Sequence, residues 1–146
     1  MNSTERKRPD WNEYGMLLAS AAAQRSPDPH MIVGAAAFRK DRSTIATGYN
    51  GAHPGEEIDW TDRDARRPHV LHAEYNCLKY TKPGEPYYLY VTLLPCSGCL
   101  SLAADYGVKE IYYSEIYNRD TSALTKAADL GIEIRQISLA SPYLLK

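Results

Sequence analysis

The hydrophobic pattern of the first forty residues predicts a helix followed by a buried strand. Apolar residues recur at helical spacing from Tyr14 to about Gln24, and Asp10 with Glu13 three positions later has the spacing of a capping box. The continuous apolar run at 31–38 is typical of a strand that is covered on both faces. The first forty residues therefore predict one α-helix and one β-strand.

The rest of the chain alternates strands with helices, apart from one long polar segment. Residues 50–67 contain Gly and Pro and have no clear period, and irregular chain of such length in a compact domain is often functional. The remaining predicted elements are strands at 44–49, 87–92, 110–113 and 132–137 and helices at 71–80, about 95–106 and 122–130. This alternation predicts an α/β fold whose later strands are parallel and joined by right-handed crossovers.

Length, charge and hydrophobicity indicate a single domain that binds a small molecule. The 146 residues suit one domain, 1–146, with a core at about 10–137 and a tail at 138–146. The net charge of -1 and the absence of a basic block favour a small-molecule partner over a nucleic acid. No apolar run approaches the roughly 20 residues that would span a bilayer, and the polar start lacks the core of a signal peptide. We therefore expect no membrane partner.

The three cysteines indicate metal binding better than disulfide bonding. Cys77, Cys96 and Cys99 form an odd and small set, and two of them lie three positions apart. Cysteines kept as metal ligands fit a reducing compartment, so we expect a cytoplasmic protein.

Two predicted helix starts carry residues that together can bind and use a zinc ion. Cys96 and Cys99 share a helix face at an N-terminus that favours thiolates, and His72 adds a neutral imidazole from the other helix. These three ligands leave the fourth tetrahedral position of one Zn²⁺ per chain open to water, as in catalytic sites. Glu74 is expected to act as general acid and base rather than as a fourth ligand.

Each part of this pattern also has a simpler interpretation. Cys96 and Cys99 alone could form a redox pair, and His53 or His69 could complete a structural zinc site. A single His-x-Glu is common by chance on a solvated surface. Cys77 is expected to be a small buried hydrophobe.

The chain also resembles a known superfamily. His72-Ala73-Glu74 followed by Pro95-Cys96-Ser97-Gly98-Cys99 is similar to the metal motifs of the cytidine and deoxycytidylate deaminases. Gly48-Tyr49-Asn50-Gly51 with Pro54-Gly55 resembles the deoxycytidylate branch in particular. The similarity covers residues from about 14 to 137, in the segments 33–35, 47–51, 54–55, 72–76, 89–99, 107–113 and 131–133.

This resemblance implies a three-layer α/β/α sandwich with a five-stranded mixed sheet. It implies zinc-dependent hydrolysis of dCMP to dUMP and ammonia, with His72, Cys96 and Cys99 as zinc ligands and Glu74 as the acid-base residue. Members of the family form homo-oligomers, often hexamers, and we expect a homo-oligomer here.

The resemblance also implies substrate contacts. Asn50 is expected beside the nucleotide sugar, together with its motif neighbours Tyr49 and Gly51. The alternative is a tight turn at a strand end, since Asn-Gly favours positive φ. Ala73 and Asn76, next to the metal motif, are also expected at the substrate, although Asn76 could instead be a packing amide.

Two further assignments complete the expected site. Tyr113 or Tyr117 could place an aromatic face against the pyrimidine, and we assign Tyr117, against the alternative of ordinary packing. Arg63, Arg66 and Arg67 have the geometry to bind a phosphate, and we assign Arg66. The alternative partners of these arginines are the acidic residues of the same segment, Asp59, Asp62 and Asp64.

Departures from the family pattern leave other functions open. No cysteine lies between Asn50 and Val70, so a second zinc is not expected, and both the exact substrate and regulation by dCTP or dTTP remain open. A deaminase of another cytosine nucleotide or nucleoside is the nearest alternative. A tRNA adenosine deaminase would need a basic surface and would not be expected to carry the Gly-Tyr-Asn-Gly motif. A non-catalytic zinc module would have no need of Glu74.

Overall fold

The computed structural model describes residues 7–116 and 121–139 and contains one five-stranded mixed sheet. The strand order is β2-β1-β3-β4-β5, in which β1 is antiparallel to both neighbours and β3, β4 and β5 are parallel. The strands are β1 (Gly34–Phe38), β2 (Thr44–Tyr49), β3 (Tyr88–Leu93), β4 (Glu110–Glu115) and β5 (Glu133–Gln136). The helices are α1 (Trp11–Ala23), α2 (Arg63–Arg66), the 3₁₀ turn η2 (Arg67–His69), α3 (Ala73–Leu78), α4 (Ser97–Asp105) and α5 (Ser122–Asp129).

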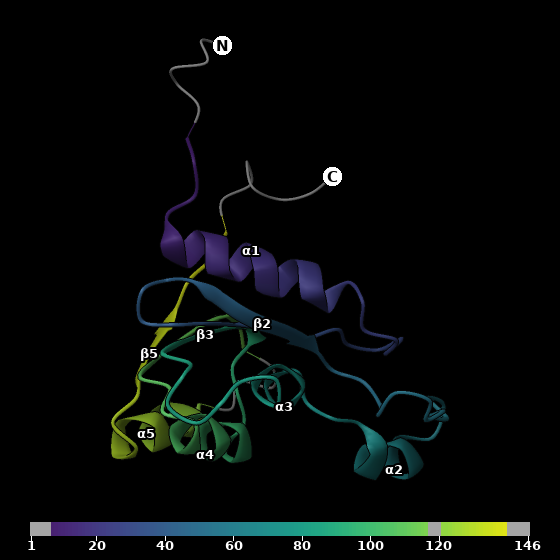
Figure 1. Ribbon diagram of the computed structural model, residues 1–146. Helices are drawn as coiled ribbons and strands as arrows, with labels where there is room; N and C mark the ends of the chain where they lie inside the picture. Colours follow the sequence, from purple (N-terminus) through teal and green to yellow (C-terminus); the bar gives the residue numbers. More distant parts are fainter. Residues whose placement is uncertain (1–6, 117–120, 140–146) are drawn as a thin grey trace.

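The helices cover both faces of the sheet. Figure 1 shows α1 on one face and α3, α4 and α5 on the other, while α2 lies to one side. The expected three-layer α/β/α sandwich with its five-stranded mixed sheet is therefore confirmed. No helix in the described part of the chain is both long and apolar enough to cross a membrane.

Helix α1 begins where the capping box predicted it. The Asp10 carboxylate accepts a hydrogen bond from the Glu13 backbone N–H at 2.8 Å, and the Asp10 N–H donates to Glu13 Oε1 at 3.0 Å. The helix then packs closely on β1, because Gly34 has no side chain. A Cβ at Gly34 would lie 1.8 Å from the Ala19 carbonyl oxygen, so any larger residue would force α1 away from the sheet.

Two apolar clusters lie on the opposite faces of the sheet. Under α1, Met16, Phe38 and Tyr90 form the core, and the Phe38 and Tyr90 rings meet edge to face with centroids 5.3 Å apart. On the other face, Leu78 of α3 and Leu100 of α4 pack against Leu89, Val91 and Ile111 of the sheet. This second cluster fixes the starts of α3 and α4 relative to each other.

The sheet topology brings the ends of several strands together at one end of the sheet. Strands β2 and β3 are both antiparallel to β1, so their carboxyl ends, at Tyr49 and Leu93, lie at the edge where β1 begins. Strand β4 is parallel to β3 and ends there as well, at Glu115. The carboxyl ends of parallel strands are the usual place for a ligand site in an open α/β sheet.

Several predicted elements differ from the observed ones. The strand predicted from residue 31 begins only at Gly34, because the backbone of Met31 and Val33 binds the Asn50 side chain instead of a neighbouring strand. The helix predicted from residue 71 begins at Ala73, because Leu71 forms a β-bridge with Gly51. The segment predicted to be irregular contains α2 and η2.

Candidate active site

Three potential metal ligands meet at the starts of α3 and α4. His72 is the N-cap residue of α3, Cys96 is the N-cap residue of α4, and Cys99 lies in the first turn of α4. Both cap residues have extended backbone and make no side-chain capping bond, so their side chains are not needed to complete the helices. The three residues are the group predicted from the sequence.

The spacing of the donor atoms fits one zinc ion. His72 Nδ1 lies 3.3 Å from Cys99 Sγ and 3.7 Å from Cys96 Sγ, and all three donor atoms lie within 4.8 Å of one another. Tetrahedral zinc with ordinary Zn–N and Zn–S bonds separates N and S ligands by about 3.6 Å. Neither His53 nor His69 belongs to this group within the described residues, and His69 lies 3.6 Å from Glu56 instead.

The charges of the group also favour a cation. Hydrogen bonds from Cys99 and His72 lower the pKa of the Cys96 thiol to about 3, whereas the Cys96 thiolate raises the pKa of Cys99. The contact with Cys96 in turn raises the pKa of His72. A thiolate on Cys96 therefore disfavours a second thiolate on Cys99, because the two negative charges repel each other. A bound Zn²⁺ offsets this repulsion, since it stabilises both thiolates.

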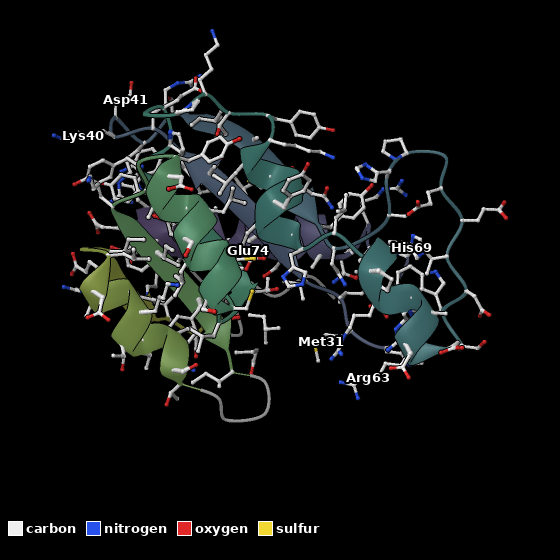
Figure 2. All side chains as sticks on the ribbon, turned by 90° about the horizontal axis from the view of Figure 1, so that it is seen from below. Met31, Lys40, Asp41, Arg63, His69 and Glu74 are labelled. Carbon is white, nitrogen blue, oxygen red and sulfur yellow. The ribbon has the colours of Figure 1, made fainter. Side chains whose placement is uncertain are left out.

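Glu74 lies buried beside these ligands. The residue is 4% exposed and stands in the first turn of α3, two positions after His72. Desolvation raises the pKa of its carboxyl group, although the His72 imidazole partly opposes the shift. Figure 2 shows Glu74 between α3 and α4. A buried carboxyl group with a raised pKa is suited to taking up a proton and releasing it again.

A cavity of about 230 Å³ opens over this group. Polar side chains from four segments line it, and apolar side chains form the rest of its wall. The lining residues are Asp28, Met31, Val33, Asn50, Val70, His72, Ala73, Glu74, Leu93, Leu94 and Cys96. Few polar groups in an apolar wall are typical of a site for a small, flat ligand.

Of the predicted substrate residues, Asn50 and Ala73 line this cavity. Asn50 is 7% exposed and holds the loop before β1 with its side-chain amide. Its Oδ1 accepts from the Val33 N–H at 2.8 Å, and its Nδ2 donates to the Met31 carbonyl at 2.9 Å. The amide therefore shapes one wall of the cavity.

The other motif residues connect the elements that carry the site. Asn76 Nδ2 donates to the Tyr49 carbonyl at 2.8 Å and so ties α3 to the end of β2. Gly51 exchanges backbone hydrogen bonds with Leu71, at 3.1 and 2.7 Å. Tyr49, Gly51 and Asn76 are not among the described residues that line the cavity, and Tyr117 lies outside the described residues.

Arg66 does not line the cavity, but it shares a hydrogen-bond partner with the segment that leads into the cavity wall. Its Nη1 donates to the Trp60 carbonyl at 2.7 Å, and the same oxygen lies 3.0 Å from His30 Nε2. His30 directly precedes Met31 of the cavity wall. Among the described residues no ion pair joins Arg66 to an aspartate; Asp62 instead caps α2.

Sequence reasoning missed several residues of the cavity wall, namely Asp28, Met31, Val33, Val70, Leu93 and Leu94. The apolar members have no chemical signature, and only their position at strand ends could have indicated them. Asp28 stands between two prolines, in a segment that the pattern marks only as the end of α1. Cys77 is fully buried, as expected, and its thiol donates to the Ala46 carbonyl at 3.4 Å.

Comparison with known proteins connects this site to one family. Residues 9–115 match the family profile of the cytidine and deoxycytidylate deaminase zinc-binding region. Human deoxycytidylate deaminase is 33% identical over 128 residues, which cover 81% of this chain and 72% of the human protein. The deoxycytidylate deaminase of Mycobacterium phage D29 is 37% identical over 123 residues, which cover 73% of this chain and 95% of the phage protein.

A solved structure shows the same architecture. The dCMP deaminase of cyanophage S-TIM5, in complex with dCMP and dUMP, superposes with a TM-score of 0.77 at 31% sequence identity. The match covers 90% of this chain and 100% of the phage chain.

Proposed function

The chain belongs to the cytidine and deoxycytidylate deaminase family, and from this premise we propose that it hydrolyses dCMP to dUMP and ammonia. The observation that carries the proposal is the buried Glu74 carboxyl group beside the donor group of His72, Cys96 and Cys99, in the wall of one cavity that His72, Glu74 and Cys96 line. The named relatives and the cyanophage enzyme support dCMP as the substrate.

Zinc held by His72, Cys96 and Cys99 would supply a Lewis acid that makes water a nucleophile at neutral pH. The thiolates of Cys96 and Cys99 come from the N-terminal end of α4, where the helix dipole stabilises negative charge. The chain thus provides a donor set with three protein ligands, which is the number that catalytic zinc sites use.

Glu74 moves the protons of the reaction. Its carboxylate takes a proton from the attacking water and delivers it to N3 of the pyrimidine as the new C4–O bond forms. It then takes the remaining hydroxyl proton and delivers it to the 4-amino group, so that the C4–N bond breaks and ammonia leaves. One water is consumed for each ammonia released, and Glu74 returns to its starting state.

The apolar wall orients the base and limits access of other water molecules. Val33, Val70 and Leu94 line the cavity from three different segments, so a flat ring can be held between them. Asn50 supports this wall through the loop before β1. Ordering the base against the acid-base residue lowers the entropic part of the barrier.

A substrate panel tests the proposal. We expect the zinc-loaded chain to release ammonia from dCMP with a kcat/KM at least about tenfold above those for dCTP, CMP and deoxycytidine. If another compound of the panel has the highest kcat/KM, the deaminase chemistry is supported and that compound replaces dCMP as the proposed substrate. No turnover of any cytosine compound would contradict the proposed function.

We also propose that Arg66 binds the 5′-phosphate. Among the described residues its guanidinium makes one hydrogen bond, to the Trp60 carbonyl, which leaves further N–H groups for an anion. His30 Nε2 lies 3.0 Å from the same Trp60 carbonyl oxygen. This shared oxygen connects Arg66 to the loop that forms part of the cavity wall.

Replacing Arg66 with glutamine is expected to raise KM for dCMP by roughly 10- to 100-fold, since a hydrogen bond to a charged group is lost. The kcat/KM for deoxycytidine, which has no phosphate, should change less than about twofold. Steady-state kinetics on both substrates check this. Arg67→Gln removes the same charge one residue away and should leave both values within about twofold. An equal effect of the two variants would contradict a specific contact.

The domain organisation, the cellular compartment and the oligomeric state are proposed from the family resemblance. We assign the whole activity to one domain, 1–146, in a cytoplasmic homo-oligomer, which the family resemblance supports as a hexamer. Thiolate zinc ligands favour a reducing compartment. Tyr75 and Tyr80 are 40% and 67% exposed, and large exposed aromatic residues are common in subunit interfaces.

A further inference from the structure

Asp28 lines the same cavity as Glu74, and the mechanism above makes no use of it. One of its oxygens is fully engaged by the loop. Oδ1 accepts from the His30 N–H at 2.8 Å and from the Met31 N–H at 3.2 Å. These two bonds fix the orientation of the carboxylate, because they hold one oxygen against the backbone.

The second oxygen retains acceptor capacity. Oδ2 has one neighbouring donor among the described residues, Asn50 Nδ2, at the long distance of 3.4 Å. That nitrogen already donates to the Met31 carbonyl at 2.9 Å. No lysine, arginine or histidine of the described chain forms an ion pair with Asp28. A carboxylate oxygen can accept about two hydrogen bonds, so Oδ2 can accept a further one from a ligand.

The chemistry of the substrate identifies the donor, given the proposed function. Apart from its phosphate, dCMP carries two groups that can donate, the 4-amino group and the 3′-hydroxyl. The amino group must lie at Glu74, where it leaves. A carboxylate repels the phosphate, which leaves the 3′-hydroxyl as the partner of Oδ2.

We propose that Asp28 is a specificity residue, whose Oδ2 accepts a hydrogen bond from the 3′-hydroxyl of the substrate sugar. The inference rests on the proposed function. It assigns the recognition of the sugar to Asp28, while the Asn50 amide holds the loop that carries this carboxylate. A site with an acceptor for a hydroxyl discriminates against the analogue without it, because that acceptor then loses its ligand donor.

The test compares dCMP with 2′,3′-dideoxycytidine 5′-monophosphate, which lacks only that hydroxyl. We expect the unsubstituted chain to prefer dCMP by roughly 10- to 100-fold in kcat/KM. In Asp28→Asn the preference should fall to within about threefold, because the neutral amide presents its N–H₂ group or a weaker acceptor. If Asp28 only shapes the loop, the variant lowers kcat/KM for both compounds equally and the preference persists, which would overturn the inference.

Ser26→Ala is the matched control. The Ser26 hydroxyl accepts from the Asp28 N–H at 3.2 Å and donates to the Asn50 carbonyl at 2.9 Å, but Ser26 does not line the cavity. This variant loosens the same loop and should keep the preference for dCMP.

The unsubstituted chain alone can also decide the question, should Asp28→Asn fail to fold. Equal turnover of both compounds would overturn the role of Asp28 and leave the proposed function intact. Turnover of neither compound by the zinc-loaded chain would contradict the proposed function and, with it, this inference.

Discussion

Replacing Glu74 with glutamine is expected to lower kcat for dCMP by about 10³- to 10⁴-fold, because the amide has the shape of the carboxyl group but cannot take up a proton. The zinc content should remain at one ion per chain, since Glu74 is not a member of the ligand group. The affinity for dCMP should change less than about threefold, since the lost interaction acts in the transition state. Ammonia release and equilibrium binding on the same preparation check these values.

The stability of this variant separates a chemical role from a structural one. Burial raises the pKa of Glu74, so its ionised form is disfavoured in the folded protein. A neutral amide should therefore leave the melting temperature unchanged or raise it. Glu56→Gln, an exposed carboxylate beside His69, is the control and should retain activity within about twofold. Activity of Glu74→Gln at the level of the unsubstituted chain would exclude Glu74 as the acid-base residue.

Replacing Cys99 with alanine is expected to remove zinc and with it the activity. Cys99 is 7% exposed, and its Sγ lies 3.3 Å from His72 Nδ1 in the donor group. A catalytic metal supplies several kcal/mol of transition-state stabilisation, which corresponds to a loss of about 10³-fold or more in rate. The melting temperature should also fall, because zinc binds the folded chain and stabilises it. Metal analysis and thermal unfolding measure the two effects.

Cys77→Ala gives the matched control, because the chain offers a third cysteine outside the donor group. Cys77 lies on the buried face of α3, so its replacement by alanine should cost about 1 kcal/mol of stability. Its zinc content and kcat should stay close to those of the unsubstituted chain. A Cys99→Ala chain that kept one zinc ion would contradict the assignment of the ligand.

Much of the fold follows from patterns that are local in the sequence. Asp10 and Glu13 mark the start of α1 correctly, because both partners of the capping box lie within one helical turn. The donor group was also predictable, since Cys96 and Cys99 share a helix face and only His72 comes from another element. The buried core around α3 and α4 then brings the two helix starts together.

The parts that could not be predicted depend on contacts between distant residues. The apolar run at 31–38 predicts too early a start for β1, because Asn50 forms hydrogen bonds with the backbone of Met31 and Val33 from 17 to 19 positions away. The pattern also predicts too early a start for α3, because Leu71 forms a β-bridge with Gly51. In both cases an apolar residue has the local pattern of an element while its backbone pairs elsewhere.

The position of Asp28 at the cavity also depends on contacts between distant residues. A carboxylate in a Pro-rich turn usually shapes that turn, and Asp28 does so through Oδ1. Asp28 lines the cavity together with Asn50 and Glu74, which lie 22 and 46 positions away in the sequence. The spacing of residues in the sequence does not indicate which carboxylate oxygen of Asp28 binds the loop and which can accept a hydrogen bond from a ligand.

The central claim is that one zinc ion on His72, Cys96 and Cys99, with Glu74 beside it, deaminates dCMP. The most direct test measures zinc content, ammonia and dUMP in a single preparation incubated with dCMP. We predict one zinc ion per chain and equal amounts of ammonia and dUMP, both of which disappear when a chelator removes the metal and return when zinc is restored. Full turnover of dCMP by the metal-free chain, or one zinc ion per chain with no dUMP formed, would contradict this account.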